Sequence, residues 1–324
     1  MLNKIAQKAC NFYGNMVLFL KYYRKIIFAG PTSQTKKQLS RQEESKLENN
    51  LESIANFKIT KVRRDRHQRR QDSHVHPYYE ILYVINGYCT FFSGHNIYQL
   101  NQGDLVIVPQ GTLHKSTYPE TGYSERYVIN FPEKGLEWLR QLVDKEIIRE
   151  MLQAGAISIP DKRKDYLESL MGQMLAEFEG QDMLSPAFIQ AELLEILLFI
   201  IRCQRFSQNV VKEFDETNQL IQSVATYVYE NFHRHITLSD TALRFHISRS
   251  YLSKKFKAVT GFGFKEYLIN IRIQNACRML LETDQSITDI ALSCGFNDSN
   301  YFGDAFRHVK GISPNHYRKN REMI

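Results

Sequence analysis

The chain has 324 residues, of which 43% are hydrophobic and 24% charged, with a formal net charge of +7. This length is enough for two domains with separate cores, and the composition is that of a globular protein. Five scattered cysteines without a CxxC pair exclude a disulfide framework and indicate reduced thiols. A modest positive charge permits an anionic partner without establishing one.

Residues 1–55 are an N-terminal extension whose structure the sequence leaves open. The segment 16–30, MVLFLKYYRKIIFAG, is apolar but interrupted by basic residues, so it is too short and too charged to span a bilayer. It also lacks the small-residue cleavage site of a signal peptide. An interfacial or partner-binding helix and an unpacked extension both remain open. The polar residues 31–50 indicate a linker or an exposed helix.

The residue pattern changes in the region 56–132. Short β-branched and aromatic runs alternate there with Gly, Asn and Pro, as in EILYVINGYCTFFSG and YSERYVINF. Such runs, bounded by turn residues, are typical of antiparallel strands. We therefore expect a small antiparallel β domain.

Histidines and a glutamate recur at fixed spacings in this β region. HVHPYYEILYVING has the spacing H-x-H-x3-E-x6-G, and GDLVIVPQGTLH has the spacing G-x5-P-x-G-x2-H. Both resemble the two motifs of the cupin superfamily, which implies a small β-barrel. Strand alternation would place His74 and His76 on one face, and the resemblance adds Glu80 and His114 to the same site.

Two kinds of site fit these four residues. Three imidazoles and a carboxylate can bind a divalent ion such as Mn, Fe, Ni or Zn. They can equally hydrogen-bond a small-molecule effector, or one another, at the mouth of a barrel. We expect an effector-binding pocket without metal or other cofactor. If a divalent metal is present, its ligands are His74, His76, Glu80 and His114.

From residue 133 to residue 214 the apolar period becomes helical. YLESLMGQMLAEFEG (166–180) and FIQAELLEILLFIIRCQRF (188–206) are the clearest cases. The second is apolar on nearly all sides, which favours burial of one stripe on the β domain and of another across a dimer interface. We expect a helical linker and dimerisation region.

The last third of the chain contains an internal repeat and holds 14 Lys and Arg against 9 Asp and Glu from Thr217 onward. TLSDTALRFHISRSYLSKKFKAVTG (237–261) matches SITDIALSCGFNDSNYFGDAFRHVKG (286–311) at an offset of 49, which becomes 50 after the turn. A one-residue insertion in a turn is what loops tolerate. The repeat therefore predicts two copies of one structural unit.

Each copy carries start and stop signals for two helices. A capping box opens the first helix, a Ser or Asp caps the second, and a glycine ends it. These signals are Thr237 with Asp240, Ser248 and Gly261 in the first copy, and Ser286 with Asp289, Asp298 and Gly311 in the second. Two short helices joined by a tight turn form a helix-turn-helix, whose second helix enters the major groove of DNA. In the last of these helices we expect Tyr301, Phe302 and Phe306 to form the inner face.

The segment between the copies sets their separation. FKEYLINIRIQNACRMLLET (264–283) is a twenty-residue amphipathic pattern. It predicts about 30 Å of helix at about 1.5 Å per residue. Successive major grooves on one face of DNA lie about 34–36 Å apart. One rigid helix could therefore hold both recognition helices in adjacent grooves.

This region resembles the DNA-binding domain of the AraC/XylS family of bacterial transcription regulators. The resemblance runs from about Ile221 to Arg318 and rests on SYLSKKFKAVTG, FKEYLINIRIQNACRML, ITDIALSCGFNDSNYF and GISPNHYR. Arg and Asn can read base edges, Ser contacts base or phosphate, and Lys neutralises phosphate. The resemblance implies these DNA-binding residues: Arg249, Ser250, Ser253, Lys254, Ser299, Asn300, Asp304 and Arg307.

Two positions depart from the family pattern. Thr241 stands where an apolar core residue is usual, and Asp304 stands where a basic residue is common. An acid at that position opposes phosphates, although it could accept a hydrogen bond from a cytosine amino group. We therefore expect the second unit to bind DNA more weakly or more selectively than the first.

The sequence thus predicts an α+β fold with a cupin-like β-barrel over 56–132, a helical linker and dimerisation region over 133–214, and an all-α double helix-turn-helix domain over 215–320 that folds on its own core. We expect a cytoplasmic, sequence-specific transcription regulator that is controlled by a small-molecule effector and is not an enzyme. The expected partners are double-stranded DNA, the effector and a second copy of the chain, with RNA polymerase as a further candidate and no membrane. The alternative is a metal-dependent cupin enzyme with an accessory DNA-binding domain.

Overall fold

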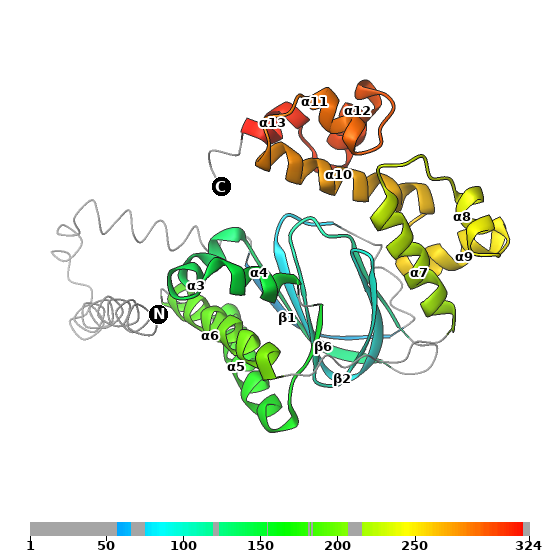
Figure 1. Cartoon of the computed structure of the whole chain (residues 1–324). Coiled ribbons are helices and arrows are strands. Elements are labelled where there is room, and N and C mark those ends of the chain that lie inside the picture. Colours follow the sequence, from blue (N-terminus) through cyan, green and yellow to red (C-terminus); the bar gives the residue numbers. More distant parts are fainter. Residues whose placement is uncertain are drawn as a thin grey trace, which may run out of the picture.

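The computed structural model describes residues 57–65, 75–118, 123–153, 155–180, 182, 184–206 and 216–319. The N-terminal extension, with its segment 16–30, and His74 lie outside this described part. Within it, a β domain is followed by a layer of helices and then by a helical C-terminal domain (Figure 1). No helix in the described ranges is both long and apolar enough to cross a membrane.

The β domain is built from seven strands in the described part of the chain. Five of them pair antiparallel in the order β1-β6-β2-β4-β7, and β3 and β5 both pair with the second half of β2. The strands are β1 (Lys58–Arg64), β2 (Tyr79–Ser93), β3 (Asn96–Asn101), β4 (Asp104–Val108), β5 (His114–Thr117), β6 (Ser124–Phe131) and β7 (Ala156–Ser158).

The sheet curls around β2 and stays open. The first half of this 15-residue strand pairs with β4 and β6, its second half pairs with β3 and β5, and a register shift lies between Val84 and Asn86. Such irregularities bend a strand and increase its twist. No pairing among the described strands closes the sheet, so the expected cupin-like β-barrel is present as an open, curled sheet.

Successive residues of β2 face opposite sides of this sheet, as a side-chain period of two requires. Ile81 and Tyr83 lie in the outer cluster that the helices cover, whereas Leu82 and Val84 lie in the inner cluster enclosed by the curl. The inner cluster is completed by Cys89, Phe91, Leu100, Val106 and Val108.

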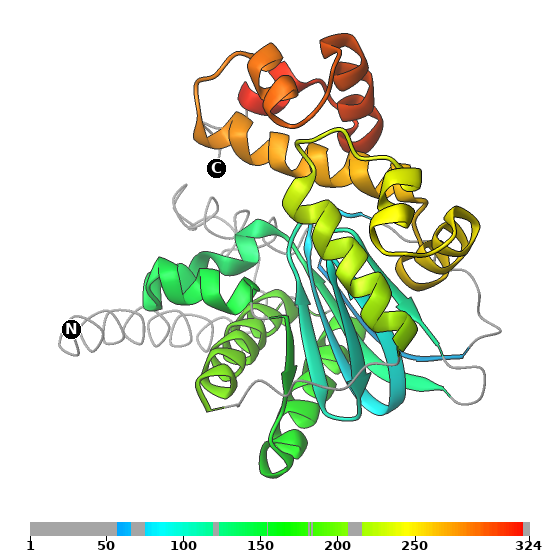
Figure 2. The ribbon, with the colours of Figure 1, turned by 45° about the vertical axis from the view of Figure 1, so that its right-hand side comes forward.

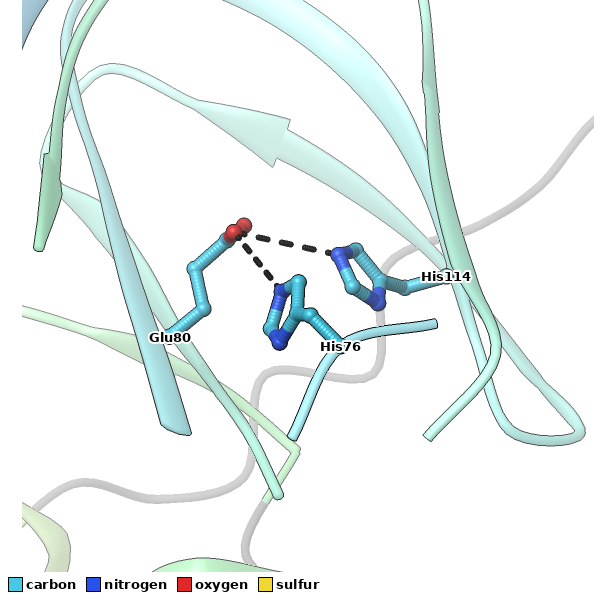
Figure 3. Close-up of side chains that lie close together, drawn as sticks. All are labelled: His76, Glu80 and His114. Carbon is cyan, nitrogen blue, oxygen red and sulfur yellow. Dashed lines mark hydrogen bonds and ion pairs between the residues drawn. The ribbon is translucent and has the colours of Figure 1, made fainter. Parts of the chain in front are cut away.

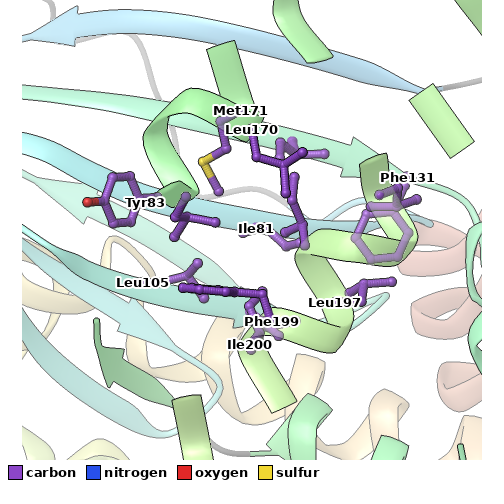
Figure 4. Close-up of a cluster of buried hydrophobic side chains, with 14 of the residues drawn as sticks. Ile81, Tyr83, Leu105, Phe131, Leu170, Met171, Leu197, Phe199 and Ile200 are labelled. Atoms are coloured by element: carbon purple, nitrogen blue, oxygen red, sulfur yellow. The ribbon is translucent and has the colours of Figure 1, made fainter. Parts of the chain in front are cut away.

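The helices after β6 pack on the outer face of the sheet. They are η2 (Glu133–Leu136), α3 (Glu137–Leu142), α4 (Lys145–Gln153), α5 (Asp161–Gly180) and α6 (Ser185–Phe206). The two helices expected at 166–180 and 188–206 are therefore present as α5 and α6. Figure 4 shows their side chains in one buried cluster with strand residues: Leu170, Met171, Leu197, Phe199 and Ile200 against Ile81, Tyr83, Leu105 and Phe131.

The helix α6 buries one broad face and leaves another open. Its expected contact with the β domain is present, because most of its apolar residues belong to the outer cluster. On the opposite face Phe188 and Leu198 are 48% and 36% exposed, and the exposed Glu195 and Arg202 lie between and beyond them. The outward stripe is therefore mixed, not purely apolar as the sequence pattern indicated.

The C-terminal domain consists of two helix-turn-helix units joined by α10. The helices are α7 (Glu216–Asn231), α8 (Leu238–Arg244), α9 (Arg249–Thr260), α10 (Phe264–Glu282), α11 (Ile287–Ser293), α12 (Ser299–Lys310) and α13 (Pro314–Lys319). The predicted central helix over 264–283 is confirmed by α10. The two predicted recognition helices are α9 and α12.

The predicted helix caps are confirmed. Gly261 and Gly311 end α9 and α12 with φ angles of 86° and 74°, in the left-handed region that glycine adopts without strain. Each helix start is capped by a side-chain oxygen that accepts from a backbone N–H: Asp240 to Thr237 at 3.1 Å, Tyr251 to Ser248 at 3.2 Å, Asp289 to Ser286 at 3.0 Å and Asn300 to Asp298 at 2.7 Å.

Two core positions differ from expectation. Thr241 is buried at this core position, and its hydroxyl donates a hydrogen bond to the Thr237 carbonyl at 2.8 Å, so its polar group is satisfied there. Phe302 and Phe306, one helical turn apart, form the inner face of α12, whereas Tyr301 is 45% exposed. The expectation that Tyr301 belongs to the inner face is wrong, because adjacent helical residues point about 100° apart.

The C-terminal domain does not have an entirely separate core. Its first unit shares a buried cluster with Phe92, Ile97 and Leu113 of the β domain. Figures 1 and 2 show the domain seated on the β domain, with α7 running beside the sheet. The first unit therefore shares its buried cluster with the β domain, which the expectation of a domain with its own core did not include.

Candidate functional site

Three of the four residues predicted to form a site in the β domain meet at one end of the inner face. His76 lies in the segment before β2, Glu80 is the second residue of β2, and His114 is the first residue of β5. Figure 3 shows both imidazoles pointing at the Glu80 carboxylate. All three side chains are buried.

The distances within this cluster are those of direct contacts. Glu80 Oε2 lies 3.3 Å from His76 Nε2 and 3.8 Å from His114 Nε2. The centroids of the two imidazole rings are 4.7 Å apart, with the rings in an edge-to-face arrangement. Tyr78 stacks on His76 at 4.0 Å and Phe91 lies 6.0 Å from His114, so aromatic rings border the polar groups.

The backbone fixes the orientation of both imidazoles. His76 Nδ1 lies 2.8 Å from the Tyr78 carbonyl oxygen, and His114 Nδ1 lies 2.9 Å from that of Thr112. A carbonyl oxygen only accepts, so each Nδ1 carries the proton that it donates. Both Nε2 atoms are thereby directed at Glu80, where each can donate when the ring is protonated or bind an electrophile when it is neutral.

The Glu80 carboxyl is kept ionised by these neighbours. Burial on its own raises the pKa of Glu80, because a charge is costly away from water. The hydrogen bonds from His114 and His76 and their positive charges outweigh burial and hold this pKa well below its usual range. The site therefore presents an anion between two potential donors.

Loop contacts, not strand alternation, place His76. The prediction paired His74 and His76 on one strand face, but β2 starts only at Tyr79 and His74 is not among the described residues. His76 is held by the hydrogen bond from Gly111 N to its carbonyl oxygen at 2.9 Å. The strand explanation is wrong for His76, while its meeting with Glu80 and His114 agrees with the predicted site.

The same three residues would fit a divalent cation. Their ligand atoms all lie within 4.8 Å of one another, and each imidazole has its other nitrogen bonded to a carbonyl, as metal-ligating histidines commonly do. Two imidazoles and a carboxylate suit several divalent transition metals. His76, Glu80 and His114 would hold such an ion, which would supply a Lewis acid.

Sequence reasoning missed a buried cation on the same inner face. Arg126 of β6 is among the largest fully buried side chains. Its Nη1 donates to Ser116 Oγ at 2.7 Å, and its guanidinium lies 5.3 Å from the centre of the Tyr118 ring. The burial of Arg126 follows from the pairing of β6 with β2, because Arg126 is paired with Val84, a residue whose side chain faces inward.

In the C-terminal domain, the outer faces of α9 and α12 are open to solvent. All eight side chains predicted there are exposed, and none belongs to a buried cluster: Arg249, Ser250, Ser253, Lys254, Ser299, Asn300, Asp304 and Arg307. The inner residues Leu252 and Phe256 of α9, and Phe302 and Phe306 of α12, hold these helices on their units. We call these two exposed surfaces the recognition faces.

Asp304 has a partner that the sequence analysis did not foresee. Its Oδ1 lies 3.1 Å from Arg307 Nη1, one turn further along α12. The pair is largely exposed, so its contribution to stability is small. The contact places the positive charge of Arg307 beside the Asp304 carboxylate and so offsets part of its negative charge.

The repeat also contains two exposed tyrosines that were not predicted as site residues. Tyr251 is 39% exposed and Tyr301 is 45% exposed. They occupy matching positions in α9 and α12, at the offset of 50 that relates the second helices of the two units. The alignment of the two copies could have drawn attention to them, because a tyrosine stands at the same position in both.

Comparison with known proteins covers most of the described chain. The family model described as an AraC-like ligand binding domain matches residues 56–197, and the one described as a helix-turn-helix domain matches residues 241–320. The chain belongs to the AraC family. In this AraC-family protein the first match includes the sheet, the helices α3 to α5 and the first part of α6, and the second includes both recognition faces.

Relatives of this AraC-family chain are named as regulators. An "Uncharacterized HTH-type transcriptional regulator" of Staphylococcus aureus is 27% identical over 248 residues, which are 75% of this chain and 32% of the relative. The chain thus spans about a third of the length of that relative. The "HTH-type transcriptional activator RhaR" of Mannheimia succiniciproducens is 24% identical over 257 residues, or 79% of this chain and 90% of that protein.

Two solved structures are similar to parts or most of the chain. The DNA-binding domain of AdpA, solved in complex with a target DNA, is 29% identical, covers 31% of this chain and 92% of its own, and has a TM-score of 0.31. ToxT from Vibrio cholerae is 13% identical, covers 83% of this chain and 99% of its own, and has a TM-score of 0.34.

Proposed function

We propose that this AraC-family protein is a sequence-specific DNA-binding transcription regulator controlled by a small-molecule effector. One observation carries the proposal: two capped recognition helices expose polar and basic side chains on the two units that a single helix joins. That helix, α10, has 19 residues, or about 28 Å at 1.5 Å per residue. Adjacent major grooves on one face of DNA lie about 34–36 Å apart. The helix is only slightly shorter than this, and the difference is less than the length of a recognition helix.

The proposed effector site is the buried cluster of His76, Glu80 and His114, with His74 as a further candidate. Glu80 supplies a charged acceptor, and each imidazole Nε2 accepts when its ring is neutral and donates when it is protonated, so a small molecule with several hydroxyl or amino groups would be held in a defined orientation. Arg126 adds a buried positive charge on the same face. No catalytic role is assigned to these groups.

The proposed partners are double-stranded DNA and a second copy of the chain. We place the protein in the cytoplasm, where DNA is accessible and thiols stay reduced; Cys89, Cys203, Cys277 and Cys294 are free and buried. RNA polymerase is a further candidate partner, because a regulator bound beside a promoter can contact it.

The outward face of α6 is the proposed dimer contact. Phe188 and Leu198 expose large apolar side chains there, and Tyr166 of α5 is 48% exposed beside them, its ring 5.4 Å from Phe199. Burying apolar surface contributes about 25 cal/mol per Å². A symmetric contact would bury these apolar side chains on both protomers.

Glu192, at the edge of this face, should make stability depend on pH. Burial, followed by the negative charges of Glu177 and Glu195, raises the pKa of Glu192 to about 7. A carboxyl with a raised native pKa stabilises the folded state below its unfolded value, and this stability is lost as pH rises through about 7. Replacing Glu192 with Gln should flatten the unfolding free energy between pH 5 and 8, as measured by urea titrations. An unchanged slope would contradict the assignment.

The proposed DNA contact of Lys254 can be tested by salt dependence. Replacing Lys254 with Ala removes one phosphate-neutralising charge, so binding should weaken on all sequences and the slope of log affinity against log salt should fall by about 1. Lys162→Ala, an exposed lysine of α5, removes the same charge outside the recognition faces. Fluorescence anisotropy on operator and random duplexes at several salt concentrations measures both, and equal slopes for the two variants would contradict the proposal.

Asn300 should behave differently from Lys254. An asparagine that reads a base edge contributes about 1–3 kcal/mol of discrimination at one base pair. Asn300→Ala should therefore relax the preference at a single position, with little change in the salt slope. Selection of random duplexes by wild-type and variant protein measures this. An unaltered preferred site would remove Asn300 from the base-reading residues.

We propose that the effector binds without a resident metal, and metal analysis tests this. The purified chain should contain much less than one equivalent of divalent metal. The second candidate function, a metal-dependent enzyme of the cupin type, is favoured by the fit of His76, Glu80 and His114 to a cation. One full equivalent, lost on chelation together with part of the thermal stability, would favour that candidate.

A further inference from the structure

Three hydrogen-bond acceptors converge at one end of the inner face of the sheet. His76 and His114 each donate to a backbone carbonyl through Nδ1, so a neutral ring directs the lone pair of its Nε2 toward Glu80 (Figure 3). A nitrogen of each ring and a Glu80 carboxylate oxygen lie within 4.8 Å of one another. A primary ammonium group has three N–H donors and a positive charge, so it can donate to all three acceptors.

Asn130 of β6 adds a further acceptor beside Glu80. The two residues are paired directly across β2 and β6, and the Cβ atoms of such a pair lie about 4.5–5.5 Å apart on the same face. The Asn130 Oδ1 atom is buried and has no hydrogen-bond partner in the described part of the chain. A buried acceptor without a donor is costly, and an N–H group of a ligand would satisfy it.

A buried cation lies further along the same inner face. Arg126 is 2% exposed and is paired with Val84, whose side chain faces inward. Its Nη1 donates to Ser116 Oγ at 2.7 Å, and its guanidinium lies 5.3 Å from the centre of the Tyr118 ring. The planar fork of a guanidinium matches the two oxygens of a carboxylate, which it binds through parallel N–H donors.

Two buried hydroxyl groups accompany Arg126. Ser124 is two residues earlier on β6, so its side chain faces the same side, and it is 0% exposed. The oxygen of Tyr118 is also buried, and neither hydroxyl makes a hydrogen bond of normal geometry within the described ranges. Hydroxyl groups can donate to a carboxylate oxygen. Arg126, Ser124 and Tyr118 therefore offer donors to an anionic group.

Apolar side chains lie between the two ends. Leu82 of β2 and Val128 of β6 are paired with each other, two residues from the pair of Glu80 and Asn130. Leu82 belongs to the inner cluster, and Val128 packs against it. Val128 is nevertheless only partly buried, so the inner face is not closely packed at this point. The middle of the face therefore suits an aliphatic segment of a ligand.

The separation of the two ends follows from positions along the strands. Arg126 and Asn130 are four residues apart on β6, which corresponds to about 13 Å between their Cα atoms. On β5, His114 and Ser116 are two residues apart, or about 7 Å. Because the Arg126 guanidinium reaches Ser116, the distance that a ligand must span lies between these two values.

Charge favours one class of ligand over two others. A neutral polyol would displace water from a buried carboxylate and a buried guanidinium without bringing a charge to either, which is costly. A divalent ion would occupy His76, Glu80 and His114 but would not reach Arg126. A molecule with a positive group at one end and a negative group at the other would make charge-assisted hydrogen bonds at both.

We propose that the effector is a small zwitterion, whose ammonium group binds His76, Glu80 and His114 and whose carboxylate, at the opposite end of a short aliphatic chain, binds Arg126. This inference rests on the proposed effector site and names the class of its ligand. Opposite charges at the two ends fix the direction in which the ligand lies. A molecule with only one of the two groups loses one set of contacts.

Three matched compounds test the inference on the wild-type full chain. ε-Aminocaproate carries both groups, hexylamine only the ammonium and caproate only the carboxylate, and all three have the same number of carbon atoms. In calorimetric titrations after treatment with a chelator, ε-aminocaproate should bind at least about tenfold more tightly than either of the others, because hydrogen bonds to charged groups are the strong ones. The chelator ensures that no metal ion occupies the acceptors.

Two substitutions assign the ends. With Arg126→Met, ε-aminocaproate should bind no more tightly than hexylamine, whose own affinity should change by less than about twofold. With Glu80→Gln, hexylamine and ε-aminocaproate should both bind about tenfold or more weakly, while caproate is unaffected. Lys61→Met is the matched control, because it removes a cation that lies over Tyr127 on the outer face of the same sheet. It should keep all three affinities.

Equal affinity of the wild-type chain for ε-aminocaproate and hexylamine would overturn the carboxylate end, and equal affinity for ε-aminocaproate and caproate would overturn the ammonium end. Absence of binding by all three would contradict both. Should Arg126→Met fail to fold, Tyr118→Phe removes only a hydroxyl and should weaken ε-aminocaproate but not hexylamine. Failure of the proposed function would appear separately, as absence of sequence-specific DNA binding by the wild-type chain.

Discussion

Replacing Leu194 with Glu should lower the unfolding free energy by at least about 3 kcal/mol and yield insoluble or partly unfolded protein. Leu194 is only 7% exposed and belongs to the cluster between the helices and the sheet. The substitution would remove a packed side chain and bury a carboxylate without a partner. Urea titration of any soluble fraction and its near-ultraviolet circular dichroism measure the loss.

Leu198→Glu, on the same helix, separates folding from assembly. Leu198 is 36% exposed in one protomer, so a charge there should change the stability of the monomer by only about 0.5 kcal/mol. If α6 forms the dimer contact, the variant should sediment as a folded monomer. Leu243→Glu, at a position 75% exposed on α8, is the matched control and should remain a dimer. A folded Leu198→Glu dimer would place the interface elsewhere.

Replacing His114 with Ala should abolish the response to effector. A compound that raises the Tm of the wild-type chain should bind the variant about 10- to 100-fold more weakly, because one lost hydrogen bond to a charged or polar ligand costs about 1.5–3 kcal/mol. A thermal-shift screen of small metabolites on both proteins measures this. His76→Ala should give the same result, because its ring faces the same carboxylate.

Lys61→Ala is the control for this experiment. Lys61 is an exposed residue of β1 whose ammonium lies 3.3 Å from Glu125, so the variant changes a surface ion pair of the same domain without touching the site. It should keep every thermal shift seen with the wild type. If the His76 and His114 variants keep them as well, the cluster has a structural role and the effector binds elsewhere.

The helix-turn-helix units could be predicted in detail because their signals are local. Side-chain caps, a glycine in the left-handed region and apolar residues one turn apart act within about four residues, so they appear in the sequence wherever they occur. The repeat then located the second unit from the first. Tyr301 was misplaced because three aromatic residues were assigned to one face, which the helical period does not allow.

Local sequence patterns were not sufficient to predict the β domain. The motif spacing brought His76, Glu80 and His114 together, yet it did so by analogy, and the strand explanation for His76 was wrong. The open sheet depends on β3 and β5 both pairing with one half of β2, which no local pattern records. Arg126 was missed because its burial depends on which face of β6 turns inward.

The sequence by itself determined the two recognition units, the helix that separates them and the identity of the residues on their outer faces. Each of these depends on interactions between residues close together in the chain. Only the tertiary structure decided that Gly111 bonds both His76 and Gln274, and that Phe92 and Leu113 join the core of the first unit. Those contacts connect residues up to 163 positions apart, and they form only after the sheet has curled and the C-terminal domain has docked against it.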